Sequence, residues 1–273
     1  MLVKTDFYHF NGSKLAHIKL CRESKANALN SEMIHQFQEC VESIQKQDGV
    51  RLVVLTAQGK HFSAGADLGW MKDSATMSFE ENIADARTLH NLIQSIATLP
   101  QMTIALAHGA AYGGALGFLA ACDYVLSDTD TKFCLSEVKL GLLPAIIYPF
   151  LMNKMHPAAL KKLALTAQVF NAEEALKYGL VDDVCNTSNK SQFLFETFQH
   201  LLKTAPESVQ DLKDLHQLVQ DHKSPDTASF IAVARTREEG QHGLHSFFEK
   251  STPKWVYNLE PQDSEWQRFI ANL

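Results

Sequence analysis

The stretch that decides the fold is HFSAGADL, residues 61–68. It directly follows the apolar run Leu52–Thr56, which is rich in β-branched residues and suits a strand buried on both faces. Small residues stand where that strand would end and a helix would begin. Backbone there can approach a ligand closely, and free N–H groups at a helix start can point outward. The segment predicts a strand-to-helix junction that presents backbone donors.

A second segment of the same kind, GAAYGGALG at residues 109–117, directly follows the short apolar strand expected at Met102–Ala107. Two N–H groups converging on one carbonyl oxygen would form an oxyanion hole, which is worth about 3–4 kcal/mol per donor. Taken singly, each segment is more simply interpreted as a tight turn, because Gly-rich junctions serve many α/β folds. Neither matches the nucleotide motifs GxGxxG or GxxxxGK(S/T), and Ser63 is not in a GxSxG elbow.

Strands and helices are expected to alternate on either side of these segments. The strands are Leu15–Leu20, Arg51–Thr56, Met102–Ala107 and Asp123–Ser127; the helices are Met33–Gln47, Phe79–Leu99 and a helix from Gly113-Gly114 through Ala121. This order argues for βαβ units around a largely parallel sheet, and therefore for an α/β fold. From about Ala158 onward helical signals dominate, which indicates an α-rich cap or assembly region.

Composition excludes several classes of protein. The chain has 273 residues, 45% of them hydrophobic and 21% charged, which is ordinary for a globular protein. A formal charge of −6 gives no reason to expect nucleic-acid binding, and no run reaches the roughly 18–20 apolar residues of a membrane helix. The start, Met1–Asp6, has no signal-peptide core. Five scattered cysteines fit reduced thiols in a cytoplasmic protein, and no motif predicts a metal site.

Several of these segments resemble the crotonase (enoyl-CoA hydratase/isomerase) superfamily. They are FSAGADL (62–68), AYGG (111–114) with the following Cys122-Asp123, SKANAL (24–29), SEVKLGL (136–142), AEEA (172–175), YGLV (178–181), REEG (237–240) and FFEK (247–250). They occur in the family's order and cover about residues 10–255. The resemblance implies a ClpP-like crotonase fold, in which stacked βαβ units form a spiral core. It implies a core domain at 1–195, a C-terminal helical trimerisation region at 196–273, and a homotrimer or a dimer of trimers.

The same resemblance implies the residues of the site. Ala66 and Gly114 would be the backbone donors to a thioester oxygen, and Glu137 the catalytic acid/base. No cofactor is implied beyond the coenzyme A of the substrate, whose anionic 3′,5′-ADP end Lys25 would meet. The residues implied to border the substrate and its CoA are Lys25, Ala26, Ala28, Ala64, Asp67, Leu68, Gly113, Gly117 and Arg87.

One position departs from the family's pattern. Typical hydratases of this kind use two glutamates around one water, and the first of those positions falls on Gly117. Glu137 would then perform both proton transfers through a single water, or the enzyme would be an isomerase that needs only one carboxylate. A third interpretation brings in another acid: Asp67, Glu80, Glu81 or Asp85. A rival of another class is a non-catalytic acyl-CoA-binding or RNA-associated homologue, against which the intact oxyanion segments and the net acidity argue.

Residues 63–71, 80–87 and 133–142 are similar to bacterial methylglutaconyl-CoA hydratases of leucine breakdown, and a glycine at position 117 resembles that group's pattern. This similarity favours hydration of 3-methylglutaconyl-CoA. Its second carboxylate should meet a cation or a hydrogen-bonding group, and Arg87 is chemically favoured over Lys72 and His108 because guanidinium can grip a carboxylate with two bonds.

Apolar residues in the later part of the chain suggest assembly. The tracts Leu160–Leu165 and Phe193–Leu202 are more apolar than a solvated surface needs, so we expect subunit contacts there. Trp266 and Phe269 in the last stretch are expected to pack on the body or on a neighbouring subunit.

Overall fold

A computed structural model of the chain describes residues 1–186, 189–220 and 223–273. Its main sheet has six strands in the order β1-β2-β3-β4-β6-β9, in which only the β1–β2 pair is antiparallel. The strands are β1 Val3–Phe10, β2 Ser13–Leu20, β3 Val50–Ala57, β4 Met102–Ala107, β6 Tyr124–Asp128 and β9 Asp183–Cys185. The predicted α/β architecture around a largely parallel sheet is confirmed.

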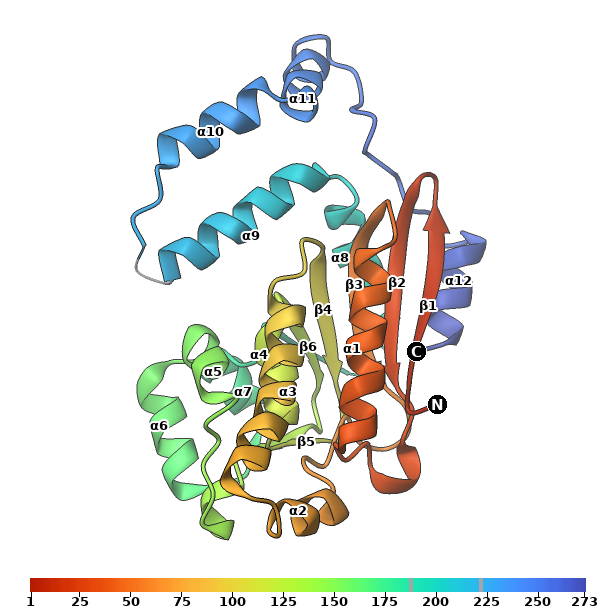
Figure 1. The fold of residues 1–273 in the computed structure, drawn as a ribbon. Coiled ribbons are helices and arrows are strands. Elements are labelled where there is room, and N and C mark those ends of the chain that lie inside the picture. Colours follow the sequence, from red (N-terminus) through yellow and green to blue (C-terminus); the bar gives the residue numbers. More distant parts are fainter. Residues whose placement is uncertain (187–188, 221–222) are drawn as a thin grey trace.

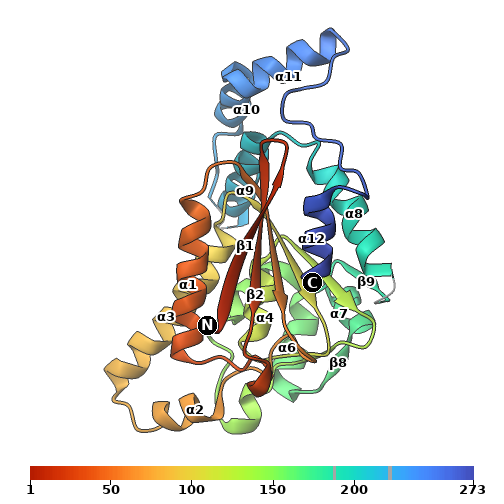
Figure 2. The same ribbon diagram turned by 90° about the vertical axis from the view of Figure 1, so that its right-hand side faces the viewer.

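Helices cover both faces of this sheet, which is why its strands β3 and β4 are largely apolar runs. Helices α1 (Ser31–Gln45), α3 (Phe79–Ala97) and α4 (Ala115–Ala121) lie on one face, as Figure 1 shows. Helices α8 (Lys190–Leu201) and α12 (Ser264–Ala271) lie on the other, as Figure 2 shows. Alternate residues of β3 divide between the two layers, so that Val53 packs on the first side and Val54 on the second.

A smaller, second sheet consists of three short strands. They are β5 (Ala110–Tyr112), β7 (Lys132–Cys134) and β8 (Phe170–Asn171), with β5 and β7 parallel and β7 and β8 antiparallel. The other short helices before residue 180 are η1 Glu23–Lys25, α2 Leu68–Ser74, η2 Glu137–Leu140, α5 Tyr148–Lys154, α6 Pro157–Thr166 and α7 Ala172–Tyr178. All seven strands and helices predicted from periodicity are present, whereas β1, α2 and the short strands β5, β7, β8 and β9 were missed.

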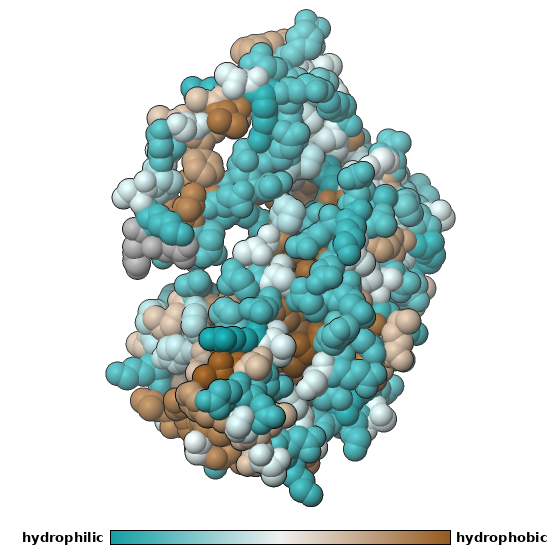
Figure 3. All heavy atoms as spheres, viewed as in Figure 1, coloured by the Kyte–Doolittle hydropathy of each residue, from teal (hydrophilic) through white to brown (hydrophobic). Residues whose placement is uncertain are grey.

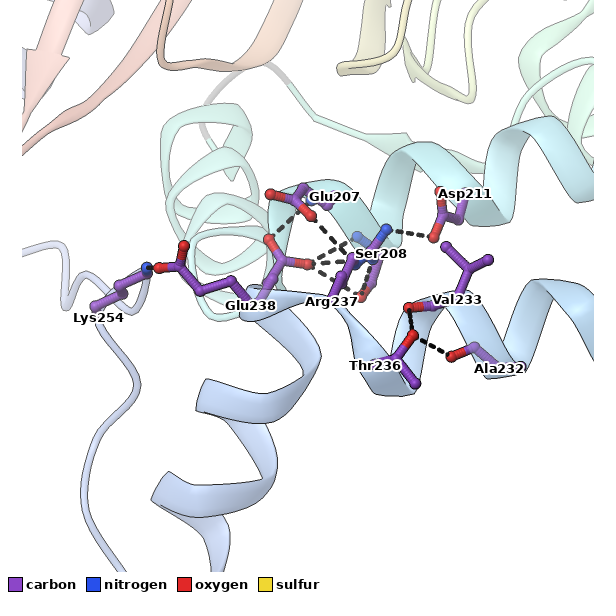
Figure 4. Close-up of polar contacts among 10 residues, drawn as sticks. Glu207, Ser208, Asp211, Ala232, Val233, Thr236, Arg237, Glu238 and Lys254 are labelled. Atoms are coloured by element: carbon purple, nitrogen blue, oxygen red, sulfur yellow. Dashed lines mark hydrogen bonds and ion pairs between the residues drawn. The ribbon is translucent and has the colours of Figure 1, made fainter.

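Three C-terminal helices form an arm that extends past one end of the main sheet (Figure 1): α9 Pro206–Gln220, α10 Thr227–Thr236 and α11 Glu238–Phe248. Arg237 joins them by ion pairs of 3.2 Å to Glu207 and 2.5 Å to Asp211, drawn in Figure 4. Glu239, only 5% exposed, accepts hydrogen bonds from the N–H groups of Glu207 and Ser208 at the start of α9. A buried carboxylate therefore fixes the first turn of α9 to the start of α11.

The apolar face of α8 is used within the chain. Leu194, Phe198 and Leu202 are buried against the sheet together with Trp266 and Phe269 of α12. This cover of the sheet's second face accounts for Leu194, Phe198 and Leu202 within the chain, and the expectation of subunit contacts along Phe193–Leu202 stays a prediction. The apolar residues of α12 pack on the body, and the domain boundary predicted at 195/196 falls inside α8.

Across the described ranges, we find no helix with both the length and the hydropathy needed to cross a bilayer.

Candidate active site

Loop 62–67 leaves one backbone donor without a partner. Within the described residues, the N–H of Ala66 makes no hydrogen bond, while its neighbours in the loop all do. Those neighbours bond as follows: Phe62 to the His108 oxygen, Ser63 to the Ala110 oxygen, Ala64 to the Ala26 oxygen, Gly65 to Ser63 Oγ, and Asp67 to the Leu29 oxygen. The exposed Ala66 N–H is therefore the donor of this loop that is available to a ligand.

The direction of the Ala66 N–H follows from its pairing with Leu29. Leu29 donates to the Gly65 oxygen at 2.7 Å and accepts from the Asp67 N–H at 2.8 Å, which makes a parallel bridge between Leu29 and Ala66. In such a bridge the central residue's own N–H and C=O point to the other side. The Ala66 N–H is therefore turned away from Leu29, and Ala66 is exposed.

A second available donor lies on the adjoining loop. Gly113 donates to the Cys134 oxygen at 2.9 Å, but among the residues described the Gly114 N–H, just before α4, has no partner. The two loops are in contact, since a Cβ on Gly65, whose φ is +93°, would lie 3.0 Å from the Tyr112 oxygen. Leu29 also reaches Gly114, because a Cβ there would lie 3.1 Å from Leu29 Cδ1. Both unpaired donors thus border the same small region.

Glu137 brings a carboxylate to these loops. It is the first residue of η2, and its Oε1 would be 3.3 Å from a Cβ on Gly113, a tight contact that the glycine at this position, whose φ is +53°, avoids. Its Oε2 is fully buried and, within the described chain, has no hydrogen-bond partner. Burial raises the pKa of Glu137 above its ordinary value. A half-buried carboxylate with a raised pKa beside unpaired donors suits proton transfer at a reacting carbon.

The position of the missing glutamate is closed by apolar side chains. Gly117 is buried inside α4, and a Cβ there would lie 2.5 Å from Ile147 Cγ2 and 2.8 Å from Ile93 Cδ1. Real Cβ atoms do not approach other atoms so closely, so even alanine would force the isoleucines to move. Gly117 therefore serves close packing, and its site holds no second carboxylate.

Of the other acids considered, Asp67 is committed elsewhere. Its Oδ1 caps α2 by accepting from Gly69 and Trp70, and its Oδ2 pairs with Arg22 at 2.8 Å. The hydrogen bond from Arg22 holds the pKa of Asp67 below its usual range. Asp67 is therefore a fixed anion bound to protein groups.

The acids at the start of α3 differ in their placing. Glu80 and Glu81 are exposed, and Glu81 closes a capping box with Ser78. Asp85 accepts from Trp70 Nε1 at 3.1 Å and lies one turn before Leu89, whose Cδ2 would be 3.8 Å from a Cβ on Gly114. Asp85 is thus the one acid of these three on the stripe of α3 that faces the site.

The residues expected along the CoA path lie at the edge of the same loops. Lys25 is exposed on η1 and forms no ion pair with any described residue. Ala26 has φ +48° and accepts from the Ala64 N–H, which joins the two loops, while Ala28 is buried beside them. Leu68 is 84% exposed at the start of α2. Lys25 and Leu68 are thus exposed on segments that are joined to the loop of Ala66.

The residues expected to meet a second substrate carboxylate are not brought to the site. Arg87 is exposed on the side of α3 opposite Leu89 and Ile93, since two residues along a helix correspond to about 200° of rotation. Lys72 is exposed in the last turn of α2. His108 makes a 2.9 Å hydrogen bond with the Gly59 oxygen, and burial lowers its pKa, so it is neutral near pH 7.

Two polar residues of loop 22–29, the buried Asn27 and the half-buried Arg22, were missed from the sequence. Asn27 is fully buried, with φ +51°, and its amide donates to the Gln58 and His61 oxygens at 2.9 Å each. Arg22 donates to the Ala28 oxygen at 2.7 Å as well as to Asp67. The tolerance of asparagine for positive φ was the available signal for Asn27, whereas no local pattern indicates the contacts of Arg22.

The described residues contain no group of three or more His, Cys, Asp or Glu side chains placed to hold a metal ion.

Known proteins are similar to this chain in fold and in sequence. Residues 11–258 match the family model described as Enoyl-CoA hydratase/isomerase. The crystal structure of an enoyl-CoA hydratase from Shewanella pealeana is similar with a TM-score of 0.87 and 35% identity, covering 93% of this chain and 96% of that one. The (E)-benzylidenesuccinyl-CoA hydratase of Thauera aromatica is 28% identical over 88% of this chain and 94% of its own length. The trans-2-decenoyl-(acyl-carrier-protein) isomerase of Streptococcus mutans is 26% identical over 89% and 94%.

The predicted crotonase fold is therefore confirmed, and the chain belongs to the enoyl-CoA hydratase/isomerase family. It is an enzyme of the enoyl-CoA hydratase type.

Proposed function

We propose that this enzyme adds water across the α,β double bond of an acyl-CoA thioester, with Glu137 as the only carboxylate at the reacting carbons. The observation that carries the proposal is the buried, unpaired Oε2 of Glu137, combined with the isoleucine-filled space around Gly117. Ala66 and Gly114 supply the donors for the thioester oxygen, because within the described residues both N–H groups lack a partner and lie on adjoining loops.

The steps follow from these groups. The thioester oxygen accepts hydrogen bonds from the Ala66 and Gly114 N–H groups, which stabilise it as an enolate oxygen once the β-carbon is attacked. Ionised Glu137 accepts a proton from water while the water oxygen bonds to the β-carbon. The protonated Glu137 then returns that proton to the α-carbon, directly or through a second water, so that H and OH are added overall. The raised pKa of Glu137 makes its acid form more available for the second step.

The CoA portion is proposed to lie along the loops at 24–28 and 64–68. Lys25 meets the phosphates of the 3′,5′-ADP end, since its ammonium is exposed. The backbone around Ala26, Ala28 and Ala64 borders the pantetheine arm, and Leu68 offers exposed apolar surface. Asp67 and Gly113 contribute through the loop geometry that they maintain. No cofactor other than the substrate's own CoA takes part in these steps.

For the acyl group we propose 3-methylglutaconyl-CoA, on the basis of the similarity of residues 63–71, 80–87 and 133–142 to hydratases of that substrate. The outward position of Arg87 leaves the second carboxylate without the grip expected from sequence. The alternative is an enoyl-CoA isomerase, in which Glu137 moves one proton along an allylic system. A single carboxylate favours it, and the Streptococcus mutans relative is named an isomerase.

The test is turnover by the wild-type enzyme of three thioesters. Hydration of 3-methylglutaconyl-CoA and crotonyl-CoA is followed by loss of the conjugated enoyl absorbance, and isomerisation of 3-hexenoyl-CoA by its gain. We expect hydration, fastest with the branched substrate. Isomerisation without hydration would move the assignment to the isomerase, and no turnover of any thioester would favour a binding protein.

We also propose that the enzyme is a homotrimer or a dimer of trimers that acts in the cytoplasm. Support for assembly comes from the arm, where Ile231, Val233, Leu244, Phe247 and Phe248 are 44–76% exposed. Figure 3 shows hydrophobic surface on this arm and over the lower left of the body. All five cysteines are free, which suits a reducing compartment. Light scattering should give a mass of three or six chains; a monomer would contradict the proposal.

A further inference from the structure

We infer that Arg22 is a positioning residue that holds the Ala66 N–H in place through Asp67, an inference that rests on the oxyanion donors proposed above.

Arg22 spans the two sides of the Ala66 loop. Its Nη1 donates both to the Ala28 oxygen at 2.7 Å and to Asp67 Oδ2 at 2.8 Å, and each side chain of the ion pair is 15% exposed. The arginine therefore links the residue before Leu29 to the residue after Ala66. A pair this sheltered is less screened by solvent than a surface pair.

Asp67, which Arg22 holds, is also hydrogen-bonded to the start of α2 and to Leu29. Its Oδ1 accepts from the N–H groups of Gly69 and Trp70, so the same carboxylate fixes the first turn of α2. The Asp67 N–H is bound to the Leu29 oxygen, which sets the plane of the peptide that follows Ala66. Both the backbone and the side chain of Asp67 are thus held, and the unpaired donor of Ala66 stands immediately before them.

Arg22 is itself anchored from behind. Its N–H donates to Asn27 Oδ1 at 2.8 Å and its carbonyl accepts from the Asn27 N–H at 3.0 Å. Fully buried Asn27 is tied in turn to the Gln58 and His61 oxygens. The guanidinium therefore acts on Asp67 from a rigid base, which a positioning role requires.

Removing the guanidinium should impair stabilisation of an enolate oxygen more than binding of a neutral thioester. Acetoacetyl-CoA, which can bind as an enolate with negative charge on oxygen, reports on the donors, and saturated butyryl-CoA reports on the CoA path alone. For Arg22→Met we expect acetoacetyl-CoA affinity to fall by about tenfold or more and butyryl-CoA affinity by less than about threefold, since donors matter most where charge has developed. Arg22→Lys should lose less of the preference for acetoacetyl-CoA than Arg22→Met does, because a cation remains to pair with Asp67.

Titration calorimetry with both ligands on wild type, Arg22→Met, Arg22→Lys and Asp67→Asn makes the test. Arg268→Met, which removes an arginine paired with Glu265 far along the chain, is the matched control and should leave the ratio of affinities unchanged. If Arg22→Met does not fold, Arg22→Lys and Asp67→Asn must still lower the ratio. Equal weakening of both ligands, or no change, would overturn the role of Arg22.

The titration is independent of turnover. A wild-type enzyme that hydrates no enoyl-CoA, but whose affinity ratio falls on substitution of Arg22, would refute the proposed reaction and support the positioning role. An active hydratase whose affinity ratio is unchanged in the variants would support the proposed reaction and refute the positioning role. A wild type with no preference for acetoacetyl-CoA would overturn the oxyanion donors and, with them, the positioning role of Arg22, whatever the turnover.

Discussion

Restoring a glutamate at position 117 should damage the protein instead of adding a catalytic group. A Cβ at Gly117 would lie 2.5 Å from Ile147 and 2.8 Å from Ile93, so the first added carbon already overpacks the core, at about 1–3 kcal/mol. The carboxylate would add several kcal/mol more, because it has no partner among those isoleucines. Replacing a glycine inside a helix with a better helix former stabilises the protein by only about 1 kcal/mol. Gly117→Glu should therefore lower the free energy of unfolding by more than about 3 kcal/mol.

Urea denaturation of Gly117→Glu, Gly117→Ala and Ala120→Glu measures this. Ala120 is half-buried in the same helix, so glutamate there controls for a charge in α4 and should cost much less. Ile147→Ala opens space at the price of a cavity, and in the double variant with Gly117→Glu the losses should be less than additive. A Gly117→Glu variant with the wild-type urea midpoint, or strictly additive losses, would refute the steric account.

Three further outcomes follow from the described contacts. Burial raises the pKa of Glu137 in the folded protein above its unfolded value, so stability present below the ordinary value of 4.5 is lost as pH rises through the folded pKa. In thermal unfolding, Glu137→Gln should therefore be more stable than wild type at pH 8 and equally stable at pH 4. Equal stability at both pH values would contradict the burial of Glu137. Asp85→Asn, which keeps an acceptor for Trp70, should retain crotonyl-CoA hydration within about fivefold, whereas a loss above about a hundredfold would make Asp85 a second catalytic acid. Glu239→Ala, compared with Glu239→Gln, should cost about 1–2 kcal/mol of unfolding free energy, because the start of α9 loses its acceptor; no loss in chemical denaturation would deny that role.

The parts of the fold predictable from sequence are those whose signal is local. β3 and β4 are continuous apolar runs because helices cover both faces of the sheet, and the small residues at 62–66 and 110–114 mark the junctions after them. The missed strands β5, β7, β8 and β9 have two or three residues each, so their formation depends on partners brought by the fold. Missing β1 has another cause, since its burial pattern alternates only in part.

The residues of the site likewise divide into those indicated by local sequence and those that depend on the tertiary structure. The family resemblance led to Ala66, Gly114 and Glu137, and the structure supplies what spacing cannot. Closure of the Gly117 position by Ile147, 30 residues further on, and the bond from Arg22 to Asp67, 45 residues apart, both arise from tertiary packing. Arg87 shows the opposite limit, because chemical suitability for a carboxylate did not fix the face of α3 on which it lies.

The most direct test of the central claim is crotonyl-CoA hydration by wild type and Glu137→Gln, with butyryl-CoA affinity measured alongside. Glutamine keeps the shape of the side chain but can neither take up nor return the proton. We expect the rate constant to fall by about a thousandfold or more, because one carboxylate carries both transfers, while butyryl-CoA affinity stays within about threefold. A variant that hydrates crotonyl-CoA within about tenfold of wild type would contradict the assignment of Glu137 as the sole catalytic carboxylate.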